Sequence, residues 1–205
     1  MSRELAEKLP NWFLGNQTEK DFDKLLSEFK GKKNLEFLEI GSFCGNSAAW
    51  MLENILTDES SKLTCVDPWN GNIVHEDFDF NDVEKAFDQQ LEPYKSRLIK
   101  EKMYSENYLM KNRDKQFDFI YIDGDHMPQA FMIDALLSWE LLKPGGIMAI
   151  DDYAWSHPRG EKYNPKKAMD LFIDMYSEHC QVIEKGWQIW IRKNSDYIRP
   201  EHIHE

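Results

Sequence analysis

The chain has 205 residues, of which 41% are hydrophobic and 13% aromatic, and its formal net charge at pH 7 is −12. These values fit one folded domain with a full core and exclude a disordered chain. The excess of acidic residues repels phosphate backbones, so we expect no nucleic-acid partner. No apolar run approaches the roughly 20 residues of a membrane span, so we expect no membrane partner.

The first ten residues, MSRELAEKLP, are charged and lack the apolar region of a signal peptide, which predicts a cytoplasmic protein. Cys44, Cys65 and Cys180 lie far apart and form no CxxC pair, as expected of reduced thiols. Residues 2–30 predict one or two helices, broken near residues 10–15. Their apolar stripe is expected to cover a sheet edge, and it consists of Phe22, Leu25, Leu26 and Phe29.

Strand and helix patterns then alternate along the chain, which predicts an α/β protein with a doubly wound, mostly parallel sheet. Loops are expected at 68–80 and 153–164, and a closing hairpin is expected to turn at Gly186. The predicted strands are 35–40, 63–66, 97–100, 117–123, 147–150, 180–185 and 187–192, and the predicted helices are 48–56, 81–91, 105–113, 129–142 and 165–178.

The stretch 117–153 reads as one strand–helix–strand unit, with the helix stopped by the KPGG sequence at 143–146. Such a crossover makes its two strands parallel neighbours. Asp123 and the pair Asp151 and Asp152 therefore emerge side by side at the carboxyl ends of adjacent strands, where open α/β sheets bind ligands. Three converging carboxylates repel one another unless a cation or protons intervene.

The loop after the first strand has the pattern Glu39-x-Gly41-x-x-x-Gly45, which permits a tight turn and close approach of a ligand to the backbone. Phe43 stands where GxGxxG has its second glycine, and this counts against a dinucleotide site. Asp67 ends the second strand, where an acid accepts hydrogen bonds from ribose hydroxyls. An ordinary structural turn remains the alternative for both places.

Four motifs in order, ExGxxxGxS, VDPW, IDGDH and LKPGG…DDY, resemble those of class I S-adenosylmethionine-dependent O-methyltransferases. Over residues 35–153 the chain is similar to the small divalent-cation-dependent members, the macrocin-type sugar O-methyltransferases and, more distantly, catechol O-methyltransferase. The resemblance implies a Rossmann-like methyltransferase fold with seven strands, the last antiparallel, and helices on both faces. We therefore divide the chain into an N-terminal helical cap (1–33), a methyltransferase domain (34–193) and a C-terminal tail (194–205).

The resemblance also implies the site residues. S-adenosylmethionine would be bound with its methionine side near the first loop, its ribose at Asp67 and its adenine near Ser105 and Glu106. Mg²⁺ or Mn²⁺ would be bound by carboxylates, and His126 would be the general base, since its reference pKa of about 6.5 suits that role. The cofactor-binding set is Glu39, Gly41, Ser42, Gly45, Ser47, Asp67, Ser105 and Asp123, and the metal set is Asp123, Asp151 and Asp152.

These residues suggest metal-dependent transfer of a methyl group to a hydroxyl of a small molecule, such as a sugar or natural product. The chain is a possible homo-oligomer. A nicotinamide-dependent oxidoreductase is the first alternative, although the chain lacks the middle glycine of the first loop and a Tyr-x-x-x-Lys pair. A noncatalytic cofactor-binding module is the second. Structural roles also stay open for Asp125 as a helix cap, for Asp151 and Asp152 as a turn, and for His126 as a surface group.

Overall fold

The computed structural model describes residues 5–71 and 77–196, so the middle of the loop 68–80 and most of the tail lie outside the described residues. The seven strands form one sheet in the order β3-β2-β1-β4-β5-β7-β6. Strands β1 to β5 pair in parallel, and β7 is antiparallel to both β5 and β6. The predicted seven-stranded Rossmann-like fold, with its antiparallel last strand, is confirmed. The strands are β1 (Glu36–Ile40), β2 (Lys62–Val66), β3 (Leu98–Glu101), β4 (Phe117–Ile122), β5 (Leu142–Ile150), β6 (Cys180–Lys185) and β7 (Ile189–Lys193).

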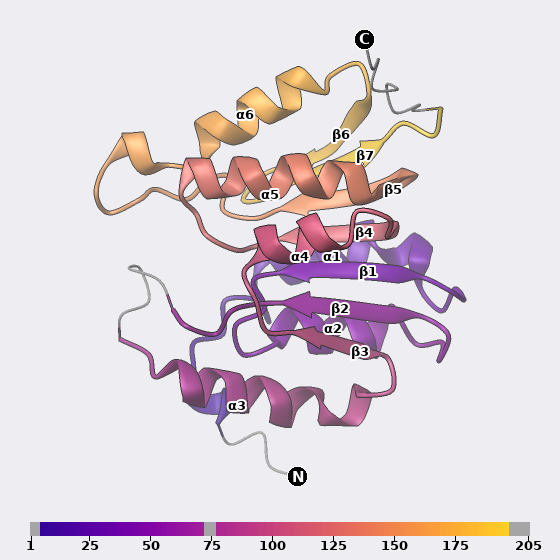
Figure 1. The fold of residues 1–205 in the computed structure, drawn as a ribbon, viewed down its shortest axis with the longest axis vertical. Helices are drawn as coiled ribbons and strands as arrows, with labels where there is room; N and C mark the ends of the chain where they lie inside the picture. The colour runs from indigo at the N-terminus through magenta and orange to yellow at the C-terminus, as the bar shows by residue number, and fades with distance from the viewer. Residues whose placement is uncertain (1–4, 72–76, 197–205) are drawn as a thin grey trace.

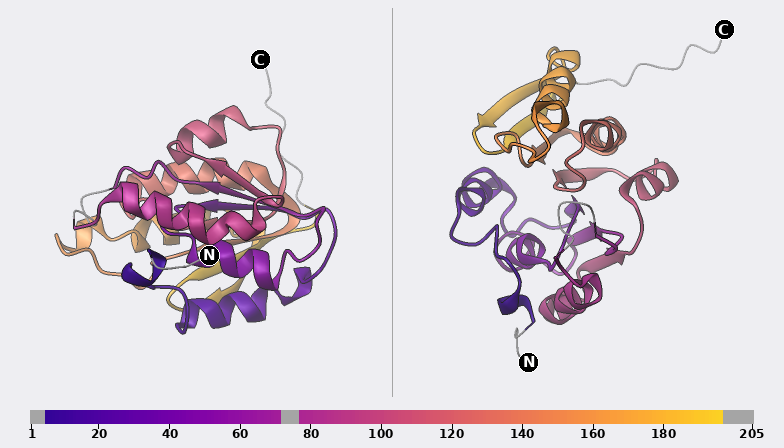
Figure 2. Two further views of the ribbon diagram at one scale, coloured as in Figure 1. Left: turned by 90° about the horizontal axis from the view of Figure 1, so that it is seen from below. Right: turned by 90° about the vertical axis from the view of Figure 1, so that its left-hand side faces the viewer.

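Helices cover both faces of the sheet. Buried side chains of α1, α2 and α3 join one core cluster, and those of α4, α5 and α6 join the other. Figure 1 shows α4, α5 and α6 in front of the sheet with α1 and α2 behind it, and Figure 2 shows the layers from two further directions. Among the described residues, no helix has both the length and the apolar character to cross a membrane. The helices are α1 (Gln17–Leu25), α2 (Asn46–Asn54), α3 (Phe80–Leu91), α4 (Ser105–Lys111), α5 (Pro128–Leu141) and α6 (Lys166–Met175), with short 3₁₀ turns at Ala6–Lys8, Ser27–Phe29, Glu92–Tyr94 and Glu161–Tyr163.

The central strand β4 shows why these sequences form a two-sided sheet. Successive side chains of a strand point to opposite faces, so a continuous apolar run suits a strand that is covered on both. Phe119 and Tyr121 belong to the core cluster under α1 and α2, whereas Ile120 and Ile122 belong to the cluster under α5. The strand thus joins both halves of the core and carries the chain to the functional edge.

The N-terminal stripe covers the face of the sheet, and the prediction that it covers an edge is wrong. The ring of Phe22 on α1 lies 5.9 Å from that of Phe119, 4.9 Å from that of Tyr121 and 5.1 Å from that of Trp190, measured between centroids. These rings belong to β4, the central strand, and to β7, which is covered by the edge strand β6 on its outer side. Edge-to-face packing of this kind stabilises aromatic pairs beyond the area they bury.

Helix α5 ends directly before the KPGG sequence at 143–146, as predicted. The strand begins earlier than residue 147 because the segment with the two glycines joins β5 as an irregular stretch, which a glycine in a strand commonly marks.

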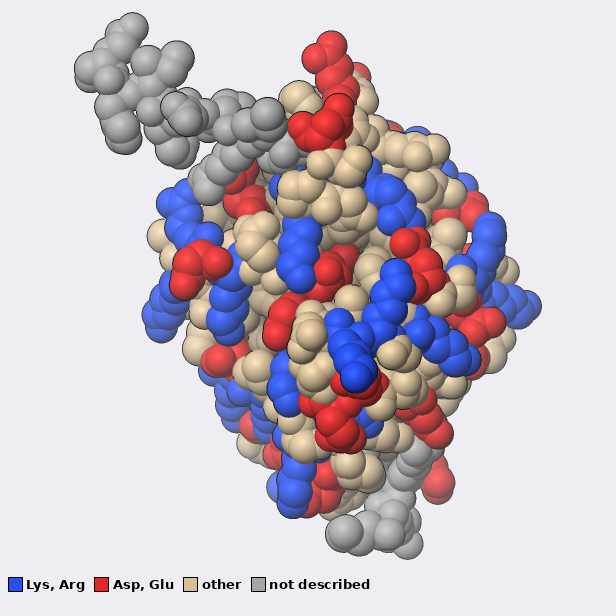
Figure 3. Space-filling model, turned by 90° about the vertical axis from the view of Figure 1, so that its right-hand side faces the viewer, with Lys and Arg blue, Asp and Glu red and all other residues tan. Residues whose placement is uncertain are grey.

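The face of the molecule at the amino ends of the parallel strands carries mixed charge. Figure 3 shows blue Lys and Arg side chains interspersed with red Asp and Glu over this face. Lys143 Nζ forms an ion pair with Asp118 at 2.8 Å, and Lys62 Nζ donates a hydrogen bond to the Ser96 carbonyl oxygen at 2.8 Å. Neither sign of charge therefore forms a large separate patch on this face.

Gly41 offers a test of the close approach between β1 and β4. Its φ is +82°, and an added Cβ would lie 1.9 Å from the Asp123 carbonyl oxygen. We expect Gly41→Ala to lower the free energy of unfolding by more than about 3 kcal/mol, because backbone atoms must move. The control is Gly15→Ala, where φ is +80° and nothing lies within 4 Å, so only about 1 kcal/mol is expected. Equal losses in denaturant unfolding would contradict the close approach.

Candidate active site

Two adjoining cavities open at the carboxyl edge of the sheet, one of about 60 Å³ and one of about 1010 Å³. Both are lined by Gly41 and Phe43 after β1, by Asp123 after β4 and by Asp151 after β5. The larger one also reaches Asp67 after β2. The edge at which the sequence places its acids is therefore the edge that is hollowed, as expected for an open α/β sheet.

Asp67 fastens the loop after β1 to the loop after β2. Its Oδ2 accepts hydrogen bonds from the backbone N–H groups of Ser42 and Phe43, both at 3.0 Å, and its Oδ1 accepts one from that of Trp69 at 2.7 Å. Burial raises the pKa of Asp67 despite these donors. Because each carboxylate oxygen accepts two hydrogen bonds, Asp67 keeps acceptor capacity for a ligand.

Glu39 lies behind the first loop and lines neither cavity. It is fully buried, accepts a hydrogen bond from Ser47 Oγ at 2.5 Å, and lies 3.5 Å from Cys65 Sγ. Burial raises its pKa. Ser47, Ser42 and Gly45 line the smaller cavity. Glu39 thus orients Ser47 from behind, and the side chain exposed to a ligand here is the serine.

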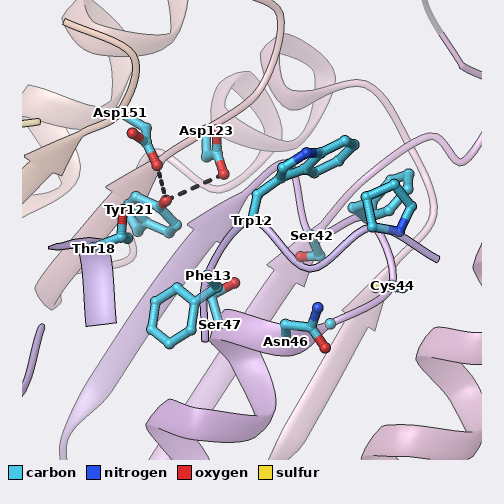
Figure 4. A pocket seen from close by; sticks show the side chains of 14 residues that line it. Trp12, Phe13, Thr18, Ser42, Cys44, Asn46, Ser47, Tyr121, Asp123 and Asp151 are labelled. Carbon is cyan, nitrogen blue, oxygen red and sulfur yellow. Dashed lines mark hydrogen bonds between the residues drawn. The ribbon is translucent and has the colours of Figure 1, made fainter. Parts of the chain in front are cut away.

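The hydroxyl of Tyr121 lies between Asp123 and Asp151 (Figure 4). It is 3.2 Å from Asp123 Oδ2 and closer still to Asp151 Oδ2, which also accepts from Gln188 Nε2 at 3.0 Å. A phenol has one proton, so it serves only one of the two carboxylates at a time. Burial, and then the negative charges of neighbouring acids, raise the pKa of both Asp123 and Asp151.

Asp152 turns toward His126 and forms the centre of the possible metal site. Its φ of 60° is in the left-handed region, and its Oδ2 lies 2.8 Å from His126 Nδ1. One potential ligand atom each from Asp123, His126 and Asp152 lies within 4.8 Å of the other two. The third predicted metal residue, Asp151, adjoins this group but directs its Oδ2 to Tyr121 and Gln188.

The electrostatics of His126 follow from this arrangement. Burial acts to lower its pKa, but the hydrogen bond to Asp152 and the charges of Asp152, Asp151 and Asp125 outweigh burial, so the pKa is raised. The ring of Trp155 lies 5.1 Å from the imidazole and shields one side of it. Asp125 accepts a hydrogen bond from the Met127 N–H at 2.9 Å, which orders the turn before α5.

Several residues that line the cavities were not singled out from the sequence. Trp12 borders both cavities and packs on Phe43 with ring centroids 5.0 Å apart, although it is 52% exposed. No pattern in the sequence around Trp12 indicated this position. Trp187, between β6 and β7, is 45% exposed and lines the larger cavity.

Asp134 on α5 is the other residue that sequence reasoning missed. It is 3% exposed, lines the larger cavity and lies close to the side chain of Ser105. Burial raises its pKa to about 7. The sequence did contain a signal for this residue. Asp134 lies between Phe131 and Ala135 on the apolar, inward side of a predicted helix, where burying an acid is unfavourable and therefore indicates a specific role. Ser105 and Glu106, the predicted adenine contacts, line the same cavity.

A family model described as a methyltransferase domain matches residues 38–153, more than half of the chain. The chain belongs to this methyltransferase family. The predicted assignment to the class I S-adenosylmethionine-dependent methyltransferases is confirmed, and the oxidoreductase alternative is excluded. No curated protein matches the methyltransferase sequence.

Solved structures share the fold of this methyltransferase at low sequence identity. An O-methyltransferase from Bacillus cereus in complex with S-adenosylhomocysteine is 18% identical, with a TM-score of 0.60 over 91% of this chain and 84% of that one. A protein from Clostridium thermocellum assigned as an rRNA-methylase is 15% identical, with a TM-score of 0.67 over 90% and 99%. MycE from the mycinamycin biosynthetic pathway, in complex with Mg and S-adenosylhomocysteine, is 13% identical, with a TM-score of 0.64 over 95% of this chain and 55% of MycE. At these identities the likeness shows the fold alone.

Asp134 gives the methyltransferase a testable pH dependence. Its pKa is raised from 3.8 to about 7, so the folded state binds the proton more tightly than the unfolded state. Its contribution is favourable below pH 4 and is lost as the pH rises toward 7. The side chain of Asp134→Asn cannot ionise. We therefore expect the free energy of unfolding of this variant to be at least about 1 kcal/mol higher than that of wild type at pH 8, and the difference to shrink as the pH falls to 4. Urea unfolding at both pH values measures this.

The control for that measurement is Asp174→Asn, which removes an exposed carboxylate on α6. Its effect on stability should not change with pH over the same interval. A pH-independent difference for Asp134→Asn as well would show that the carboxyl is not buried as described.

Proposed function

We propose that this methyltransferase moves the methyl group of S-adenosylmethionine to a hydroxyl of a small polyhydroxylated molecule, with the help of a bound divalent cation. The observation that carries the proposal is the convergence of Asp123, His126 and Asp152 within 4.8 Å beside the two cavities. Carboxylate oxygens are the ligands that Mg²⁺ and Mn²⁺ favour. Burial, and then repulsion between neighbouring acids, raises the pKa values of Asp123 and Asp151, and a cation would relieve this repulsion.

The donor would lie along the loops after β1 and β2. Gly41 brings the backbone of β1 against that of β4, and Asp67 keeps acceptor capacity for ribose hydroxyls. Ser47, oriented by Glu39, and the N–H groups around Gly45 border the smaller cavity, where the methionine end fits. Ser105 and Glu106 border the larger cavity, where the adenine fits.

Asp123, Asp151 and Asp152 would hold the cation, and Tyr121 and Gln188 keep Asp151 beside the other two. A bound divalent cation lowers the pKa of a coordinated hydroxyl and fixes its orientation. Asp152 would accept a hydrogen bond from the Nδ1–H group of His126, which leaves Nε2 to take the proton of the acceptor hydroxyl.

A small hydroxylated acceptor suits the walls of the larger cavity. Trp12, Trp155 and Trp187 line it, and aromatic faces pack against the apolar faces of sugars and rings. The net charge of −12 and the acids at this edge oppose an RNA acceptor, which the fold by itself does not exclude. MycE, a methyltransferase of a natural-product pathway whose crystals hold Mg, shares the fold and is consistent with this choice.

Manganese binding tests the metal site without a known acceptor. When Mn²⁺ is titrated into the wild-type protein, its free-ion electron paramagnetic resonance signal should decrease because the ion binds. The expected stoichiometry is one Mn²⁺ per protein chain. Asp123→Asn and Asp152→Asn should each weaken binding about tenfold or more, because each removes a charged ligand. The exposed carboxylate variant Asp174→Asn should bind as wild type does.

His126→Ala separates the two roles open to the histidine. If His126 is a base, the variant keeps its Mn²⁺ affinity, and methyl transfer to a panel of catechols and vicinal sugar diols falls by about 10² or more. If the variant loses Mn²⁺ as the aspartate variants do, His126 is a ligand and the proposed base is wrong. A wild-type protein that binds no Mn²⁺ would overturn the metal-dependent proposal.

A further inference from the structure

The wall of the larger cavity between β1 and α5 is apolar but ends in one buried acid. Ile40 and Val66 are paired residues at the carboxyl ends of β1 and β2, and both are almost fully buried. A Cβ added to Gly124 would lie 3.2 Å from Ile40 Cγ2 and 3.4 Å from Asp134 Oδ2. The wall therefore runs from two aliphatic side chains past a bare glycine to a carboxyl group.

The polar end of this wall holds two neighbouring side chains. Ser105, the first residue of α4, lies close to Asp134, and both line the cavity. A serine hydroxyl has one proton to donate, whereas a carboxylate accepts up to four hydrogen bonds. Asp134 thus has acceptor capacity beside the cavity even when Ser105 donates to it.

A flat ring with hydrogen-bond donors on one edge fits such a wall. Adenine has this form, because its faces are apolar and its exocyclic N6 amino group offers two N–H donors. Of the other acids of the cavity, Asp67 and those after β4 and β5 suit the ribose and the methyl-transfer centre, whereas Glu106 on α4 lies at the same end as Asp134. Resting on the proposal that S-adenosylmethionine is the donor, we infer that Asp134 is a specificity-determining residue that accepts a hydrogen bond from the adenine N6 amino group.

The position of Asp134 is difficult to account for by packing alone. It is 3% exposed, next to Phe131 and Ala135 of the core, and no cation is bonded to it within the described residues. Glu106 and Asp125 face it with like charge. A buried acid of this kind costs the protein stability near neutral pH, whereas Asn could accept a hydrogen bond from Ser105 without a charge. Costs of this kind are common where a side chain binds a ligand.

The competing explanation is that Asp134 only ties α5 to the start of α4 through Ser105. The two explanations differ in what the carboxyl recognises. A tie between helices affects every ligand of the cavity equally, whereas a purine contact distinguishes a 6-amino group, which donates, from a 6-oxo group, which accepts. The test is therefore a ratio of two affinities.

Calorimetric titration with S-adenosylhomocysteine and with S-inosylhomocysteine, its 6-oxo analogue, gives this ratio. Wild type should bind the 6-amino compound at least about 100-fold more tightly, because a site that hydrogen-bonds an N–H rejects the analogue that lacks it. Asp134→Asn should lower the ratio about tenfold or more, since the amide N–H₂ can donate to the 6-oxo oxygen. Asp174→Asn is the control and should keep the wild-type ratio.

Each outcome has a distinct meaning. An unchanged ratio in Asp134→Asn, or equal weakening of both ligands, would overturn the inference and leave Asp134 as a tie between helices. A wild-type protein that binds neither compound would instead refute the proposed donor. If Asp134→Asn does not fold, Asp134→Ser serves as the second variant, because a lowered ratio is expected from any side chain that lacks the carboxylate.

Discussion

Repulsion between buried carboxylates at the ends of β4 and β5 is the constraint on which the site depends. Asp123, Asp151 and Asp152 are brought together by the parallel pairing of two strands, and burial reduces the solvation of Asp123 and Asp151. One phenol, one amide and one imidazole lie against them, from Tyr121, Gln188 and His126. These donors are too few to compensate three charges, so protons or a cation must complete the balance.

The fold prepares this arrangement through backbone contacts more than through side chains. Gly41 permits β1 and β4 to meet where a larger residue would collide with the Asp123 carbonyl group. Asp67 then holds two loops in place with a single carboxylate, and both Phe43 and Trp69 adopt positive φ values there. The two loops are thus held together by hydrogen bonds within the protein, and such preorganisation reduces the entropic cost of binding a ligand.

The order of the elements and the location of the site were predictable, because both follow from periodic patterns. The alternation of apolar strands with helices sets the topology, and acids directly after strands must emerge at one edge. The direction of individual side chains was not predictable. The left-handed conformation of Asp152, which turns it to His126 while Asp151 faces Tyr121, depends on local backbone geometry that the sequence pattern does not reveal.

Long-range contacts account for the other differences. The position of Phe22 over β4 and β7, and that of Trp12 beside the cavities, arises from packing between segments distant in sequence. Asp134 was overlooked because its helix was read only for apolar periodicity, although an acid on the inward side is itself informative. Charge on a buried helix position is thus as useful a signal as charge after a strand.

The most direct measurement is an anomalous-diffraction experiment on crystals grown with Mn²⁺ and S-adenosylhomocysteine. The account predicts one strong anomalous peak, within bonding distance of carboxylate oxygens of Asp123 and Asp152 and beside the sulfur of the ligand. A peak at another place would contradict a cation as the group that balances these acids. The absence of any peak, with the carboxylates still in contact with His126 and Tyr121, would contradict it as well.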